Sequence, residues 1–149
     1  MLAVSSIYGI DILEDNVREC RRRLFEIFDR QTTARFRAKA REKCRETARY
    51  ILERNIIWGD ALTLKTVNDS PHPITFSEWS PVGRIMLKQR DFTFHELLHK
   101  DRAAPLSLFA GPDEALVSDL GEDVFIPTPE REYPLTHFLE VANADEQGL

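Results

Sequence analysis

The stretch Ser5-Ser6-Ile7-Tyr8-Gly9-Ile10-Asp11-Ile12, at positions 5–12, decides the fold that we expect of this chain. It is a short run of β-branched and aromatic residues that ends at an acid, which is typical of a buried strand. Asn55-Ile56-Ile57-Trp58-Gly59-Asp60-Ala61-Leu62 repeats the pattern, because an apolar run is again followed by an acid. A helical crossover between two such strands predicts parallel pairing, with both acids at the same edge of an α/β sheet.

Helical patterns fill the interval between the two predicted strands. Glu14, Asp15 and Asn16 supply acidic and capping side chains suited to a helix start. Apolar residues then recur at three- and four-residue steps as far as about Phe28: Leu13, Val17, Cys20, Leu24 and Ile27. A second helix is expected over residues 33–53, with one apolar stripe: Phe36, Ala40, Cys44, Ala48 and Ile51. The other faces of this second helix are strongly charged, so we expect it on the surface of the protein.

The rest of the chain has a different pattern. Residues 74–79 and 84–92 predict two strands around a turn at Ser80-Pro81-Val82-Gly83, and residues 94–99 predict a short helix. Proline and glycine recur beyond residue 104, so extended and irregular structure is expected there. We therefore divide the chain into a strand–helix–strand unit (1–66), a β-hairpin insert with a short helix (67–104) and an irregular acidic segment (105–149), within one compact domain.

Length and composition favour a globular protein that stays in the cytoplasm. A chain of 149 residues is long enough to bury a core without disulfides or a metal. Cys20 and Cys44 lack the close spacing of a metal or redox motif, which indicates reduced thiols. The apolar residues 1–12 have no basic start, so we expect no signal peptide, and no stretch approaches the roughly 20 apolar residues of a membrane span.

Charge is distributed unevenly along the chain, whose net charge is −5. Residues 18–54 hold most of the arginines, including Arg35, Arg37 and Arg41, whereas the last third of the chain is acidic. An arginine-rich helix of this kind can be a DNA-binding face. Alternatively, these arginines pair with acids of the same helix, such as Glu42 and Glu46, on a solvated surface. The interleaved acids favour this second interpretation.

The acids at the two strand ends are the candidate functional residues. Ligands of open parallel sheets lie outside the carboxyl ends of the strands. One acid there can accept hydrogen bonds from both hydroxyls of a ribose, and its neighbour can accept one from an adenine amino group, while flanking apolar residues enclose the ring. Asp11 with Ile12, and Asp60 with Ala61 and Leu62, meet these requirements. The structural alternative is that each acid only caps the segment that follows.

Three segments resemble motifs of adenine-specific DNA methyltransferases from restriction–modification systems. Tyr8-Gly9-Ile10-Asp11-Ile12-Leu13-Glu14-Asp15-Asn16-Val17-Arg18-Glu19-Cys20-Arg21 is similar to their second-strand motif, and residues 55–62 are similar to the next one. Ile74-Thr75-Phe76-Ser77-Glu78-Trp79, followed by Lys88-Gln89-Arg90-Asp91-Phe92, resembles an insert found in one branch of the family. The resemblance implies a Rossmann-like fold that binds S-adenosyl-L-methionine, with Asp11 on the ribose and Asp60 on the adenine.

The sequence also departs from that family. The glycine-rich first motif should precede Ile7, where only six residues stand, and the catalytic Asn/Asp-Pro-Pro-Tyr/Phe motif is absent from the chain. We therefore expect an incomplete methyltransferase sheet, inactive alone, with weak or no cofactor binding. It would be a fragment or subunit of a DNA adenine (N6-type) methyltransferase. A first strand without its usual neighbour predicts self-association, or docking with a separate chain that carries the missing motifs.

Two alternative functions remain open from the sequence. His95-Glu96-Leu97-Leu98-His99 fits the zinc-peptidase pattern, in which His95 and His99 bind the metal and Glu96 acts as the base that activates water. A third ligand would have to come from a downstream acid such as Glu114, across a stretch that proline and glycine interrupt, so surface histidines are favoured. The other alternative is a non-catalytic interaction module that uses the arginine-rich helix or the acidic tail.

Overall fold

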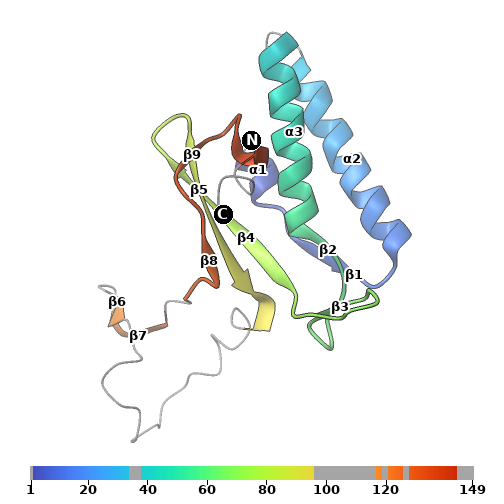
Figure 1. The fold of residues 1–149 in the computed structure, drawn as a ribbon, viewed down its shortest axis with the longest axis vertical. Coiled ribbons are helices and arrows are strands. Elements are labelled where there is room, and N and C mark those ends of the chain that lie inside the picture. The colour runs from blue at the N-terminus through green and yellow to red at the C-terminus, as the bar shows by residue number, and fades with distance from the viewer. Residues whose placement is uncertain (1, 34–37, 96–116, 119–120, 126–127, 144–149) are drawn as a thin grey trace, which may run out of the picture.

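Helices and strands are combined in an α/β arrangement in the computed structural model, which describes residues 2–33, 38–95, 117–118, 121–125 and 128–143 (Figure 1). The first part of the chain forms α1 (Leu2–Ser5), β1 (Gly9–Asp11), α2 (Glu14–Thr33), α3 (Ala38–Asn55), β2 (Ile56–Asp60) and β3 (Lys65–Thr66). The second part forms β4 (Thr75–Val82), β5 (Met86–Thr93), β6 (Val117–Ser118), β7 (Gly121–Phe125), β8 (Arg131–Glu132) and β9 (Thr136–His137).

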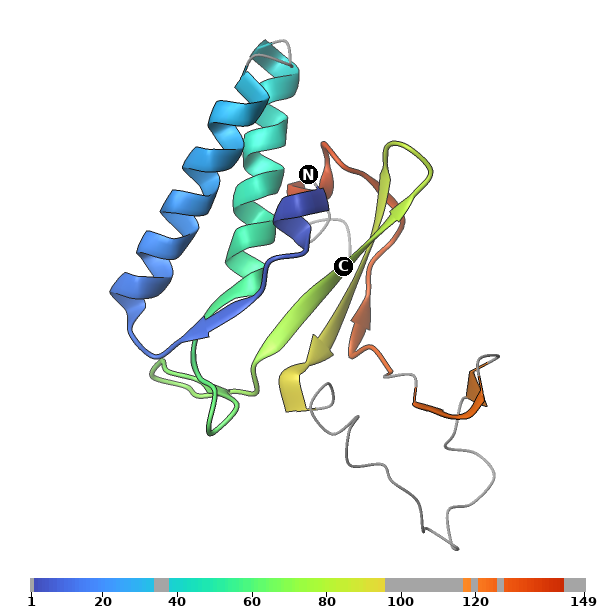
Figure 2. The ribbon, with the colours of Figure 1, turned by 180° about the vertical axis from the view of Figure 1, so that it is seen from behind.

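β1 and β2 pair in parallel, as the two repeated sequence patterns predicted. Gly9 lies opposite Ile56, and Asp11 lies opposite Trp58. The connection between the strands is the pair of long helices α2 and α3, which stands to one side of the strands (Figure 2). The first strand is shorter than predicted, because Ser5 belongs to α1 and pairing begins only at Gly9. β3 pairs antiparallel with β2 and completes a sheet in the order β1-β2-β3.

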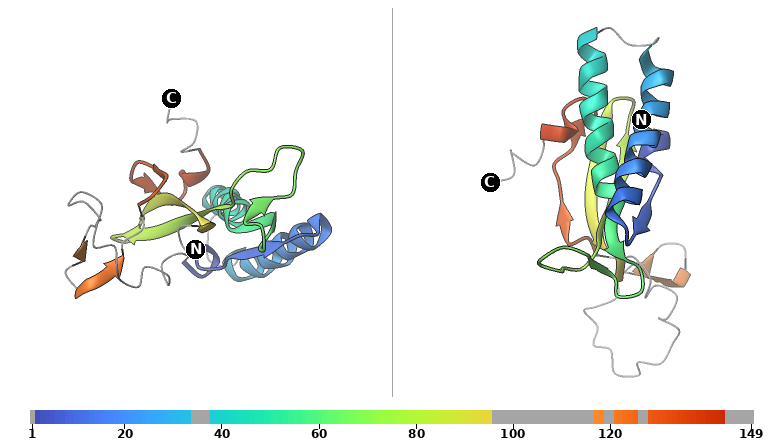
Figure 3. Two further views of the ribbon diagram at one scale, coloured as in Figure 1. Left: turned by 90° about the horizontal axis from the view of Figure 1, so that it is seen from below. Right: turned by 90° about the vertical axis from the view of Figure 1, so that its right-hand side faces the viewer.

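Helix α3 packs against α2 and the β4–β5 hairpin (Figure 3), while the charged side chains on its outer face are exposed as predicted: Glu42, Glu46, Arg49 and Glu53. Three members of the predicted apolar stripe, Cys44, Ala48 and Ile51, are buried as expected, whereas Phe36 lies outside the described residues. The buried face is wider than the stripe because two polar side chains on it find partners inside the protein. The Thr47 hydroxyl donates to the Phe138 carbonyl at 2.8 Å, and Asn55 bonds to two other segments.

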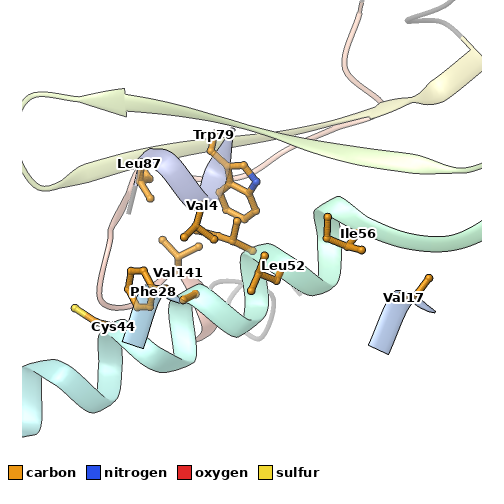
Figure 4. Packing of buried hydrophobic residues seen from close by; sticks show 11 residues of the cluster. Val4, Val17, Phe28, Cys44, Leu52, Ile56, Trp79, Leu87 and Val141 are labelled. Atoms are coloured by element: carbon orange, nitrogen blue, oxygen red, sulfur yellow. The ribbon is translucent and has the colours of Figure 1, made fainter. Parts of the chain in front are cut away.

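One hydrophobic core joins the helices, β2, the β4–β5 hairpin and the segment after β9 (Figure 4). Val4 and Val17 come from the first part of the chain, Trp79 and Leu87 from the hairpin, and Val141 from beyond β9. Burial of apolar side chains contributes about 25 cal/mol per Å² to folding, so this shared cluster couples the segments energetically. The hairpin and the end of the described chain are therefore held against the same helix, α3, as the parallel strands.

The β4–β5 hairpin matches the predicted pair of strands, but its turn lies further along the chain. Pairing runs from Thr75 opposite Thr93 to Val82 opposite Met86, which leaves residues 83–85 as the loop instead of residues 80–83. Gly83 adopts a φ of 63°, a left-handed conformation that only glycine adopts without a steric cost. The position of this glycine in the loop, after Pro81 has entered the strand, explains the shift of the turn.

We expect Gly83→Ala to destabilise the protein by about 1 kcal/mol, because a Cβ at this φ crowds its own backbone. An added Cβ would meet no other atom within 4 Å, so the cost is conformational and not a clash. Urea denaturation measures the difference. Gly83→Asn should lose less than Gly83→Ala, since asparagine tolerates the left-handed region, and equal midpoints for all three proteins would contradict this account.

The C-terminal part of the described chain is more regular than predicted. β8 and β9 both pair antiparallel with β5, with Arg131 opposite Asp91 and Thr136 opposite Leu87. The segment is extended here, as predicted, but the residues paired with β5 are regular and not irregular. Pro134 separates the two strands and limits each of them to two residues, which hides any alternating pattern in the sequence. Tyr133, which lies between the strands, is buried and ties the segment to the hairpin.

Among the residues that the structure describes, no helix has the length and apolar character needed to cross a bilayer.

Candidate functional site

Asp11 is the last residue of β1, and its carboxylate organises the loop that leads into α2. The Leu13 N–H donates to Asp11 Oδ1 at 2.8 Å, and the Asn16 side-chain amide donates to Asp11 Oδ2 at 3.1 Å. Both contacts are exposed to solvent. The acid therefore has the capping role that was the structural alternative. A carboxylate accepts about four hydrogen bonds, so capacity for a ligand remains.

Asp60 ends β2 in a closely similar arrangement. The Leu62 N–H donates to Asp60 Oδ1 at 2.8 Å, which reproduces the contact between Leu13 and Asp11. This hydrogen bond, together with those from Thr63, holds the pKa of the Asp60 carboxyl below its ordinary value. The carboxylate is therefore ionised at neutral pH and acts as an acceptor. Leu64, at the end of the same turn, has a φ of 59°, a strained conformation that fixes the course of the loop.

The parallel register brings the two acids together on one face of the sheet. Asp11 lies opposite Trp58, and Asp60 follows Trp58 by two residues, so all three side chains point to the same side. Two residues of a strand rise about 6.6 Å and neighbouring strands lie about 4.8 Å apart, which places the two Cα atoms roughly 8 Å apart. This separation is comparable with the length of a nucleoside.

Apolar side chains beside both acids are turned to solvent. Ile12 is 57% exposed, and Leu62 is 95% exposed. Ala61 is exposed as well. Exposed aliphatic residues next to paired carboxylates provide surfaces against which a flat ring can pack, while the carboxylates accept hydrogen bonds from its polar edge. The structure therefore brings together Asp11, Ile12, Asp60, Ala61 and Leu62, the five residues predicted from the sequence.

Trp58 also belongs to this site, although packing in the core is the ordinary role of a tryptophan in a strand. It is half-buried, packs against the hydrophobic core, and lies directly opposite Asp11 and two residues before Asp60. Its indole N–H donates to the Ile12 carbonyl at 3.0 Å, which links the end of β2 to the loop after β1. The spacing of Trp58 and Asp60, two residues apart within one strand, was the signal in the sequence that would have revealed this.

The zinc-binding alternative rests largely on residues outside the described part of the chain. His95 is described and exposed, whereas Glu96 and His99 lie outside the described residues. Within the described ranges, no group of three or more His, Cys, Asp or Glu side chains is arranged to hold a metal ion.

Much of the arginine-rich region is paired with acids of the same two helices. Arg22 and Arg23 both bind Glu19, and Arg22 also binds Glu26. Arg45 forms two hydrogen bonds of 2.6 Å with Asp29, which joins α3 to α2. These contacts agree with the interpretation of the region as a charged, solvated surface. Arg35 and Arg37, which were named for the DNA-binding alternative, lie outside the described residues. A DNA contact by the arginine-rich region stays a prediction that involves arginines other than those paired above.

A cavity of about 460 Å³ lies between α3, β2 and the hairpin, away from the two strand-end acids. Its lining includes Arg54, Ser77 and Asp91. Asp91 is nearly buried, and it accepts hydrogen bonds from Ser77 at 2.6 Å and from Tyr133 at 2.9 Å, with Arg54 at 3.5 Å. Buried charges of this kind need such partners. The network therefore has a structural task, since it ties the hairpin and Tyr133 to α3.

The fold and the site define an α/β chain in which each strand of a parallel pair ends at an aspartate. Comparisons with protein-family models, with curated proteins and with solved structures found no match.

Proposed function

We propose that this chain contributes the adenosine-binding half of the S-adenosyl-L-methionine site of a restriction–modification DNA adenine methyltransferase. Asp11 accepts hydrogen bonds from the ribose hydroxyls, and Asp60 accepts one from the adenine amino group. Ile12, Ala61 and Leu62 pack against the ring. In this proposal the β1–α2–α3–β2 unit is part of a Rossmann-like methyltransferase sheet.

One observation carries the proposal: the two acids share a face at neighbouring strand ends, with exposed apolar residues beside each. A single strand-end acid has an ordinary explanation as a cap. Two acids at neighbouring strand ends, each held by the N–H of the second residue after it, form a preorganised pair of acceptors. The resemblance of residues 5–94 to motifs of adenine-specific methyltransferases supplies the identity of the ligand.

Methyl transfer needs more than this adenosine-binding half of the site, which we call the half-site. The donor methyl group and the target amino nitrogen must be aligned, and residues 1–149 contain neither the glycine-rich motif nor the catalytic motif of the family. We propose that sequence beyond these residues, such as a separate chain, supplies both. The chain by itself should then bind the cofactor weakly and transfer no methyl group. DNA would be held by the assembled enzyme, with a contribution from the arginine-rich region.

Titration with S-adenosylhomocysteine tests the proposal directly. The expected dissociation constant is roughly 0.1–1 mM, since only the adenosine half is held. Saturation-transfer NMR detects binding of this strength and identifies the protons of the ligand nearest the protein. The adenine and ribose protons should receive more saturation than those of the homocysteine part. Failure to detect binding at millimolar ligand would refute the proposal, and micromolar binding would show that the half-site is more complete than we propose.

The edge of β1 gives a second prediction. Among the described strands β1 pairs only with β2, which leaves its other edge without a strand partner there. Such an edge favours association with another chain. We expect sedimentation velocity to show self-association that increases with protein concentration. A single monomeric species at high concentration would contradict this prediction.

A further inference from the structure

Trp58 lies at the centre of the candidate site, although the proposed function gives it no role. Its neighbours across and along the sheet are Asp11, directly opposite, and Asp60, two residues further on the same face. Its indole N–H reaches across the sheet and donates to the carbonyl of Ile12 at 3.0 Å. One side chain of β2 thus contacts the loop that carries the acid of β1.

This contact constrains the distance between the two acid-bearing loops. Ile12 is mostly exposed, so few packing contacts hold its backbone in place. The indole is anchored at its other end, because Trp58 packs against the hydrophobic core. A hydrogen bond from a fixed ring to a loop carbonyl restricts the loop, and with it the position of the Asp11 carboxylate relative to Asp60.

We propose that Trp58 is a positioning residue of the nucleoside site, which sets the spacing of the two carboxylates and lines the surface beside them. This inference rests on the proposed function, since it assigns Trp58 a role in binding the same adenosine group. A nucleoside whose sugar is held by Asp11 and whose base is held by Asp60 would lie beside Trp58, which is opposite Asp11 and two residues before Asp60 on the same face. The aromatic side chain of Trp58 offers a base or ribose a large, rigid contact surface.

The two tryptophans of the chain make a sharp test available. The spectrum of the ¹⁵N-labelled indole groups should contain two cross-peaks, one from Trp58 and one from Trp79. Trp79 is buried and donates to Asn55 at 3.1 Å, so its peak reports the integrity of the fold. Adenosine at millimolar concentration is the probe. We expect adenosine to shift the Trp58 peak progressively and to leave the Trp79 peak in place.

A Trp58→Phe variant identifies the peak and tests the hydrogen bond. Phenylalanine keeps an aromatic ring but has no N–H, so adenosine should bind about five- to tenfold more weakly, as expected for the loss of one hydrogen bond. An unchanged Trp79 peak in this variant shows that the fold is intact. Equal adenosine affinity of the variant and the unmodified chain would overturn the positioning role.

Two further outcomes separate this inference from the proposed function. If saturation transfer shows adenosine bound while the Trp58 peak stays still, the nucleoside lies elsewhere and the role of Trp58 is refuted, although a nucleoside site remains. If neither saturation transfer nor the indole spectrum responds to adenosine, the proposed function fails, and the inference fails with it.

Discussion

Replacement of Asn55 by Leu is expected to lower the free energy of unfolding by about 3 kcal/mol. Asn55 is fully buried at the end of α3. Its amide donates to the Ser5 carbonyl at 3.3 Å, and its side-chain oxygen accepts the Trp79 indole N–H at 3.1 Å. Leucine has a similar shape but satisfies neither group. The loss of a hydrogen bond at a buried polar group costs about 1–3 kcal/mol, and both hydrogen bonds of Asn55 are lost together.

Urea denaturation followed by tryptophan fluorescence measures this effect. Asn68→Leu is the matched control, because Asn68 is exposed in the loop after β3 and should change stability by less than about 0.5 kcal/mol. A double variant with Trp79→Phe removes the donor as well. Its destabilisation should be smaller than the sum of the two single effects, since one hydrogen bond is counted in both. Strict additivity would show that Asn55 and Trp79 do not interact.

Replacement of Asp60 by Ala is expected to weaken S-adenosylhomocysteine binding by about 10- to 100-fold. The variant should then bind too weakly to be detected at the ligand concentrations at which the unmodified chain binds. A hydrogen bond to a charged acceptor contributes about 1.5–3 kcal/mol, and alanine leaves the adenine amino group without that partner. Asp69→Ala is the control, since it removes the same charge from an exposed loop. Saturation-transfer NMR of both variants, with unchanged circular dichroism, distinguishes a lost contact from a lost fold.

The pH dependence of the same binding follows from the lowered pKa of Asp60. The N–H groups of the turn stabilise the ionised carboxylate, so its pKa lies below 3.8, the value for an unperturbed group. Any affinity due to Asp60 should therefore stay constant from about pH 7 to about pH 5 and fall only as the pH drops through the lowered pKa. A decline that begins near neutral pH would identify a different group as the acceptor.

The local chemistry of the sequence was enough to predict the parallel strand pair and the acids at its end. A short apolar run ends at Asp11, and a second one ends at Asp60. Each run predicts a strand from a few neighbouring residues alone. The hairpin was predictable for the same reason, although its turn was placed too early. The three-residue loop depends on where Gly83 adopts a left-handed conformation, and the preceding Ser80 and Pro81 looked equally suited to a turn.

What could not be predicted depends on partners that are distant in the sequence. Hydrogen bonds to Ser5 and Trp79 compensate the burial of Asn55. The residues around Ser5, Asn55 and Trp79 in the sequence do not predict these contacts. β8 and β9 are too short to show an alternating strand pattern in the sequence. They form strands because they pair with the free edge of β5 in the hairpin, which is distant in the sequence. The hydrogen bond from Trp58 to Ile12 joins two segments that are distant in the sequence, so it depends on the register of β1 and β2.

The long crossover between β1 and β2 has a consequence for the order of folding. Helices α2 and α3 are neighbours along the chain and can associate through local contacts, whereas Gly9 meets Ile56 only after a large loop has closed. The helical pair should therefore form early, and the parallel strands should join late. Asp11 and Asp60 would become neighbours at that last stage, so an intermediate rich in helix would lack the nucleoside site until folding is complete.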